Sequence, residues 1–371
     1  MSSRNKLLLT SLPAEIIREI ASSVAYAGDL AALCRTSRLL HAVSTPVLFR
    51  HLRLARVMQT LHLLNVLKIH PKRHKCVRSL RIDLPDRPSL WDSLFISTDI
   101  LWPLEDTLRR VENLTTLYIR APNFSNDKFL AIFTTLILPN LRSFSIHHTG
   151  TYSPILSSFL NRHKDLTHLE LVRPYKTAAT PDVLPLIHLP HLRSYRGCSV
   201  YAAHLVVSNQ SLAGVQIWDA PPATELDELF AALAAATSPT IPFTLTFLWD
   251  GPQTALFAPL GKHLPHTRAL DAGPFAGYRR PLTAASIKEI SEALDQFVSL
   301  TTLEFDNVED SPRIDNVESL SGGRPDPPSF SVAEDLATLD DWITHCPTLT
   351  TCRLHCRIWT RQSGKWNLLF E

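Results

Sequence analysis

The chain has 371 residues, 45% of them hydrophobic, which is enough for two domains or for one elongated domain with a sizeable core. Its 37 lysines and arginines balance 35 acidic residues, so the overall charge does not favour a nucleic-acid-binding protein. With 27 prolines and only 11 glycines, the composition indicates short elements separated by rigid breaks and argues against glycine-built phosphate loops.

Three features bear on the compartment. The only apolar run near the first residue is Leu7 to Leu9, whereas a secretory signal needs an apolar region of roughly 7–15 residues. No stretch approaches the roughly 20 apolar residues of a membrane span. The six cysteines are too sparse for a disulfide scaffold in a chain of this length. We therefore expect a cytoplasmic or nuclear protein that does not bind membranes.

The first fifty residues are expected to form three short helices. Asp29 can cap the second helix, and the third should end near Pro46. In the first helix Ile16 and Ile20 form one apolar stripe, and Ile17 lies on a neighbouring stripe. A helix that is apolar on two sides needs two surfaces to pack against.

After this helical segment the sequence repeats. Six segments share a leucine, then Thr or Arg, then Thr, Ser or His, then a second apolar residue, and five looser copies follow the same apolar spacing. The copies lie roughly 30 residues apart, a spacing typical of repeat proteins. They start at residues 49, 77, 114, 141, 166, 192, 212, 242, 267, 300 and 349. The segments between them look helical, as at 224–236 and 284–297, so each repeat is predicted to be one strand and one helix stacked on its neighbours.

Residues 306–329 break this pattern. The segment is rich in proline and glycine, contains no aromatic residue, and carries the sequence Asp-Asn-Val-Glu twice. We predict a mobile insertion within a repeat, because no apolar periodicity is available to order it.

Two resemblances give these patterns a family. Residues 12–20 read LPAEIIREI, residues 29–34 read DLAALC and residues 46–49 read PVLF, and together they resemble an F-box. The remaining chain resembles a leucine-rich-repeat array, in which Pro122, Thr149 and Pro174 stand where such repeats usually carry Asn or Cys, so the repeats are irregular. The resemblance implies an α/β protein, with an all-α F-box domain at 1–48 and an irregular leucine-rich-repeat solenoid at 49–371.

The F-box family consists of substrate receptors that are not themselves catalytic. Its F-box binds a Skp-type adaptor on a cullin-scaffolded ubiquitin ligase, and its repeats bind a protein substrate. Carried over to this chain, the resemblance assigns the adaptor contact to seven apolar residues: Leu12, Pro13, Ile16, Ile20, Leu30, Leu33 and Leu48. The alternative is a repeat-based binding module whose helical segment only caps the array and recruits no ligase.

Catalytic and metal-binding motifs are not found in the sequence. G-x-S-x-G, Walker, G-x-G-x-x-G and H-E-x-x-H patterns are all missing, so we expect neither an enzyme nor a cofactor. The C-terminal cluster of cysteine and histidine does not have the paired spacing of a zinc site. We expect Cys346 to end a helix and Cys352 to point inward from a strand; His345, His355 and Cys356 complete the cluster.

A basic stretch lies between Leu30 and Ile82, which encloses eleven lysines and arginines and no acidic residue. Nucleic acid is one candidate partner for such a stretch. We favour an acidic protein partner, because the stretch is poor in the aromatic residues on which bases would stack.

The repeat pattern also predicts which side chains face outward. In each strand the apolar positions point into the core, so the residues between them form an open face. Along the array this face would run from basic to acidic. We expect the substrate to bind there, with the proposed contacts being Arg81, Tyr118, Arg120, His147, Arg196 and Trp218. Whether neighbouring loops cover Tyr118 and Trp218 is left open.

Overall fold

A computed structural model describes residues 12–84, 100–120, 126–147, 154–172, 185–219, 221–247, 254–273, 282–305, 331–355 and 357–370. These residues form a mixed α/β structure with 13 α-helices and a mostly parallel sheet of 13 strands. The chain divides into two compact units: unit 1 is Met1–Leu166 with Pro174–Asp182, and unit 2 is Thr167–Arg173 with Val183–Glu371. No helix within the described ranges is long and apolar enough to cross a membrane. The insertion predicted at 306–329 lies outside the described residues.

Unit 1 begins with three helices, α1 (Ala14–Ser23), α2 (Ala27–Thr36) and α3 (Arg38–Leu48). Ile17 of α1 packs against Leu40 and Val43 of α3 to form a small core. We call these three helices the helical cluster.

Two details of the helical cluster differ from the expectation. Asp29 is not a cap: α2 begins two residues before it, and its carboxylate lies in the first turn, where it complements the helix dipole. Helix α3 does not end near Pro46 but continues to Leu48. Pro46 lies inside α3, and the helix continues past it: Phe49 N–H donates to Thr45 O at 3.1 Å.

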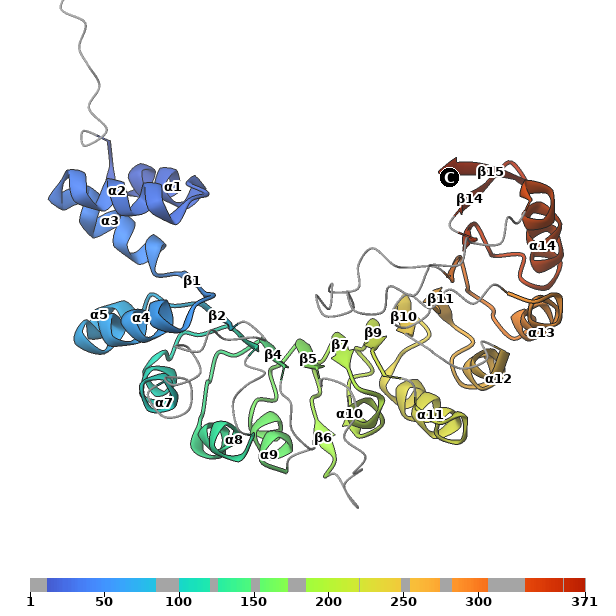
Figure 1. Ribbon diagram of the computed structural model, residues 1–371, viewed down its shortest axis with the longest axis horizontal. Helices are drawn as coiled ribbons and strands as arrows, with labels where there is room; N and C mark the ends of the chain where they lie inside the picture. Colours follow the sequence, from blue (N-terminus) through green and yellow to red (C-terminus); the bar gives the residue numbers. More distant parts are fainter. Residues whose placement is uncertain are drawn as a thin grey trace, which may run out of the picture. The chain divides into compact units, whose positions relative to one another are not determined.

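The rest of unit 1 alternates strands and helices. Strands β1 (His51–Leu54), β2 (Ser79–Asp83), β3 (Thr116–Arg120) and β4 (Ser143–His147) pair in parallel in chain order. Between and after them lie α4 (Val57–Ile69), α5 (Pro71–His74), α7 (Leu101–Arg110), α8 (Asn126–Thr135) and α9 (Pro154–Arg162). These helices lie on one side of the strands, which leaves the other side as the open face (Figure 1).

Unit 2 follows the same plan. Its parallel strands are β5 (His168–Val172), β7 (Ser194–Gly197), β9 (Gly214–Ile217), β10 (Phe243–Phe247), β11 (Thr267–Asp271), β12 (Thr302–Glu304) and β13 (Thr351–Leu354). Its helices are α10 (Ser199–Ala203), α11 (Leu226–Ala236), α12 (Thr254–His263), α13 (Ala284–Leu294) and α14 (Val332–His345), with a 3-10 turn η2 (Ala223–Glu225) before α11. A separate pair of short strands joins β6 (Ile187–His188) to β8 (Leu205–Val206).

The end of unit 2 departs from the strand-and-helix pattern. Strands β14 (Arg357–Gln362) and β15 (Lys365–Phe370) form an antiparallel hairpin that pairs with β13. The sequence pattern did not predict this hairpin. Its turn contains Ser363 and Gly364, both with positive φ, which suits a tight reversal of the chain.

The apolar periodicity correctly located the strands. Each of the eleven segments expected to hold a strand contains one. In β3, for example, Leu117 and Ile119 are buried and the residues beside them are half-buried. Aromatic side chains fill the space between strands and helices, with Phe133 of α8 in edge contact with both Phe144 and Phe159. The domain boundary at 48/49 and the leucine-rich-repeat character stay predictions.

Candidate interaction surfaces

Helix α1 has two apolar stripes, of which one is buried and the other is exposed. Ile17 and Ala21 are each 1% exposed and belong to the core of the helical cluster. Ile16 and Ile20, four residues apart on the neighbouring stripe, are 43% and 37% exposed. Covering the exposed part of each isoleucine side chain contributes roughly 1 kcal/mol, so this stripe is suited to a partner.

The other residues proposed for the adaptor contact are distributed unevenly. Pro13 is exposed, and Leu12, Leu33 and Leu48 are half-buried. Leu30 is buried, so its side chain supports the helical cluster from inside and offers little surface. Sequence reasoning missed two exposed apolar side chains of this region, those of Tyr26 and Leu39. Their types are visible in the sequence, but their exposure follows from how α2 and α3 pack.

The open face of unit 1 carries a row of stacked side chains. The register places Arg81 of β2 beside Tyr118 of β3, and the guanidinium carbon lies 4.1 Å from the centre of the Tyr118 ring. On its other side Tyr118 meets His147 of β4, with ring centroids 5.2 Å apart. Three residues named from the sequence therefore come together, and two of them flank the ring of the third.

Acidic and small residues complete this face. The carboxylate of Asp83 lies 3.1 Å from Arg81 Nη2 and 4.0 Å from Arg120 Nη1, so one acid holds both arginines. Ser145 lies between the apolar positions of β4, where the strand pattern predicts an outward side chain, but it is buried. Its position beside Tyr118 in the register explains this, because a small side chain is covered by a large neighbour.

Unit 2 presents a different set of side chains. Its register aligns Glu170 of β5 with Arg196 of β7 and Gln216 of β9. Arg196 is exposed, and Trp218, just after β9, is half-buried. Further along, Arg353 Nη1 lies 3.9 Å from Glu304 Oε2. Both faces carry hydrogen-bonding groups and one large aromatic side chain, a composition suited to binding a polypeptide.

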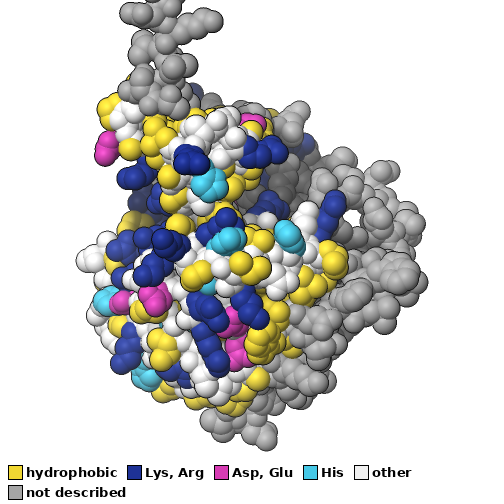
Figure 2. Space-filling model, turned by 90° about the vertical axis from the view of Figure 1, so that its left-hand side faces the viewer, with side chains coloured by type: hydrophobic (Ala, Val, Ile, Leu, Met, Phe, Trp, Pro, Cys, Tyr) yellow, Lys and Arg dark blue, Asp and Glu magenta, His cyan; other side chains and the backbone are white. Residues whose placement is uncertain are grey.

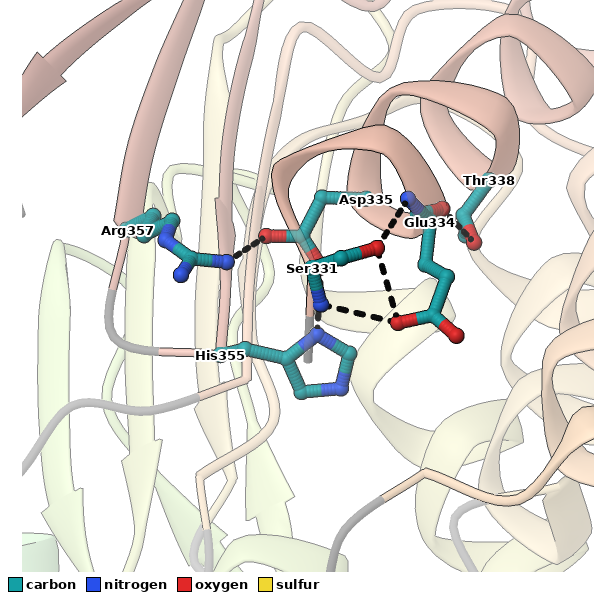
Figure 3. Close-up of polar contacts among 6 residues, drawn as sticks. All are labelled: Ser331, Glu334, Asp335, Thr338, His355 and Arg357. Carbon is teal, nitrogen blue, oxygen red and sulfur yellow. Dashed lines mark hydrogen bonds and ion pairs between the residues drawn. The ribbon is translucent and has the colours of Figure 1, made fainter. Parts of the chain in front are cut away.

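The structure contains a buried ionic cluster near the C-terminus that the sequence analysis did not predict. Asp335 of α14 is 0% exposed, and its two oxygens lie 2.6 Å from His355 Nδ1 and 2.9 Å from Arg357 Nη1 (Figure 3). His355 lies in the turn after β13 and Arg357 begins β14. The cluster therefore ties the first turn of α14 to the base of the C-terminal hairpin.

The start of α14 is fixed by a capping box beside this cluster. Ser331 Oγ accepts Glu334 N–H at 3.1 Å, and Glu334 Oε2 accepts Ser331 N–H at 2.8 Å (Figure 3). The Ser331 N–H holds the pKa of Glu334 below its usual value. Thr338 Oγ1 donates to Glu334 O one turn later. These contacts have a structural role: they order the helix that carries Asp335.

The cysteines and histidines of the C-terminal segment separate into different environments. Cys346 ends α14 and Cys352 points inward from β13, as expected, and both are buried. His345 Nδ1 lies 3.0 Å from Asp295, while His355 belongs to the Asp335 cluster. Cys356 lies outside the described residues. Within the part of the chain that the structure describes, no group of three or more His, Cys, Asp or Glu could hold a metal ion.

A scan against models of known protein families finds no match to this chain, and a search of curated proteins finds none either. The surfaces themselves are therefore the basis for the proposals below.

Proposed function

We propose that the protein is the non-catalytic substrate-recognition subunit of a Skp–cullin–F-box ubiquitin ligase. The helical cluster would act as the F-box and bind the Skp-type adaptor, which in turn links it to the cullin scaffold. The strand-and-helix repeats, which resemble leucine-rich repeats, would bind the protein substrate through their open face.

The observation that carries this proposal is that α1 has one buried and one exposed apolar stripe. A helix whose only task was to cap the repeat array would need one apolar stripe, directed at its own core. Here Ile17 and Ala21 serve that core, yet Ile16 and Ile20 remain exposed on a second stripe. A partner that covered this second stripe would remove its apolar surface from water, which favours association.

The test is a double substitution of the exposed stripe, Ile16→Asp with Ile20→Asp. Two carboxylates would be costly to desolvate in an apolar interface, so the variant should lose co-precipitation with purified Skp-type adaptor. Because both side chains are exposed, we expect its thermal unfolding midpoint to stay close to that of the wild type.

The matched control is Arg18→Gln with Ser22→Asp. These two residues are also exposed and four apart on α1, and the pair lowers the net charge by the same amount. It should leave adaptor binding intact. Adaptor binding that survives in the Ile16/Ile20 variant would refute the F-box assignment and favour a repeat protein that recruits no ligase.

A further inference from the structure

The side of unit 1 that includes α5 carries a concentration of positive charge. Lysine and arginine side chains gather on this side, next to hydrophobic ones (Figure 2). We define the basic surface as six residues, none of which forms an ion pair with any residue that the structure describes: Arg50, Lys68, Lys72, Arg73, Lys75 and Arg78.

Among the residues that the structure describes, two acids of the adjacent helix α7 do not compensate this charge. The two acids in the middle of α7 already have partners on their own helix. Glu105 lies 2.6 Å from Arg109, and Asp106 lies 2.7 Å from Arg110. The charge of the basic surface therefore remains available to a partner.

Three side chains of the basic surface are held in place by contacts within unit 1 before any partner binds. Arg73 lies 4.8 Å above the ring of Phe49, and Lys68 lies 4.4 Å above the ring of Trp102. Arg78 Nη1 donates to Asn113 O at 3.2 Å. Long cations held in this way lose less conformational freedom when they bind, which favours their use at an interface.

The basic surface adjoins the helical cluster. Phe49 directly follows α3, and Arg73 of α5 stacks on it, so α5 is held against the end of the cluster. The main chain of Arg50 accepts hydrogen bonds from the N–H groups of Arg78 and Ser79, which binds the start of β2 to the same point. A partner on the helical cluster thus has positive charge beside it.

We propose that the basic surface binds an acidic region of the same adaptor that covers Ile16 and Ile20. The inference rests on the function proposed above and adds to it a second, electrostatic contact outside the three F-box helices. Complementary charge of this kind mainly accelerates association and selects the partner. A protein is favoured over nucleic acid because little aromatic surface is offered to bases here: Phe49 is buried beneath Arg73, and Lys68 lies over one face of the exposed Trp102 ring.

The experiment reverses charge at α5 with Lys72→Glu in the helix and Lys75→Glu at its C-cap; we call this double substitution the α5 variant. Both side chains are exposed, and Lys72 lies in a first helical turn, where a glutamate is tolerated. Binding of purified Skp-type adaptor to the full chain would be followed by surface plasmon resonance at about 50 mM and about 500 mM NaCl. We expect the association rate of the variant to fall about tenfold at low salt, and the difference from the wild type to shrink at high salt, with little change in the dissociation rate.

The matched control is Lys164→Glu with Lys365→Glu, which changes the net charge equally at exposed positions that are not part of the basic surface. It should associate like the wild type. Equal rates and equal salt dependence for the α5 variant and this control would overturn the inference. If the Ile16/Ile20 variant then still lost binding, the function proposed above would stand without the basic surface.

Two further outcomes would also overturn the inference. Failure of the wild type to bind adaptor at low salt would remove both the inference and the proposed function. A fluorescein-labelled single-stranded RNA that binds the wild type, and that the α5 variant fails to bind while adaptor kinetics stay unchanged, would assign the basic surface to nucleic acid instead.

Discussion

At the scale of single residues, His163 shows how the core constrains a polar side chain. The residue is 5% exposed and follows α9. Its Nε2 accepts Leu138 N–H at 2.9 Å, and its Nδ1 lies 2.7 Å from Phe159 O, to which it donates. Burial lowers the pKa of His163 below the ordinary 6.5, an effect that the hydrogen bond to Phe159 O opposes and the charge of Arg162 reinforces. The fold therefore holds the neutral ring with its proton on Nδ1.

This constraint predicts a contribution to acid sensitivity. As the pH falls below about 6.5, the unfolded chain binds a proton at this residue and the folded chain resists it, so stability is lost as the pH falls through the lowered pKa. His163→Gln removes the titrating group. We expect the variant to be less stable than the wild type at pH 7.5, by about 1–3 kcal/mol for the disturbed buried hydrogen bonds, but to lose less stability between about pH 7.5 and 5.

The measurement is the thermal unfolding midpoint of each variant across this pH range. His62→Gln is the control, because His62 is exposed on α4, and its midpoint should follow the wild type. Parallel curves for the wild type and the His163 variant would show that His163 takes no part in the acid sensitivity.

At the scale of elements, the C-terminal hairpin depends on a contact with α14. Asp335 contacts both His355 and Arg357, so one carboxylate connects the helix to the turn before β14 and to β14 itself. The sequence does not predict this contact, because His355 and Arg357 lie 20 and 22 residues after Asp335. In the sequence, Asp335 cannot be distinguished from any other acidic residue in a first helical turn. The Ser331–Glu334 capping box, in contrast, has a short-range signature in the sequence.

Removal of the carboxylate should therefore weaken the end of unit 2. We expect Asp335→Ala to lower the free energy of unfolding by about 3–5 kcal/mol, because breaking a buried ion pair leaves charge without its compensation. Amide hydrogen exchange in β14 and β15 should accelerate more than in β3 and β4 of unit 1. Denaturant titration gives the first quantity, and exchange followed by mass spectrometry gives the second.

The control for this prediction is Asp340→Ala on the same helix. Asp340 is exposed, so its loss should change stability by no more than about 0.5 kcal/mol. If Asp335→Ala were equally mild, the cluster would not anchor the hairpin.

At the scale of the whole molecule, each unit contributes an open face with one large aromatic side chain. Tyr118 lies between Arg81 and His147, and Trp218 lies just after β9. Half-buried aromatic side chains beside arginines are frequent centres of binding energy at protein interfaces. These two side chains are therefore the ones to substitute in a test of the proposed substrate contact.

We expect Tyr118→Ala with Trp218→Ala to reduce substrate capture more than tenfold, equivalent to about 1.4 kcal/mol, and to leave adaptor binding unchanged. Substrate capture would be measured by proximity labelling in cells in which the ligase is inhibited. The control pair, Ile137→Ala with Val298→Ala, removes exposed apolar side chains outside the strands. Loss of labelling in the control pair, with none in the Tyr118/Trp218 pair, would move the substrate site away from the open face.

The sequence by itself determined where the strands lie and which of their residues point inward. Leu117 and Ile119 of β3 could be assigned to the core because alternation with a period of two is a property of adjacent residues, and it survives whatever packs around them. The same local logic identified two apolar stripes on α1 and placed Cys346 and Cys352 correctly.

The tertiary structure alone decided which α1 stripe stays exposed, how Arg81, Tyr118 and His147 stack, and that Asp335 is buried. Each of these depends on partners from other strands or helices, brought alongside by the sheet register and by helix packing. The interaction energy of such a contact belongs to both residues together. The sequence around one residue therefore does not identify the residue that it contacts. A residue's periodicity can be read along the chain, but its neighbours across the sheet exist only once the chain has folded.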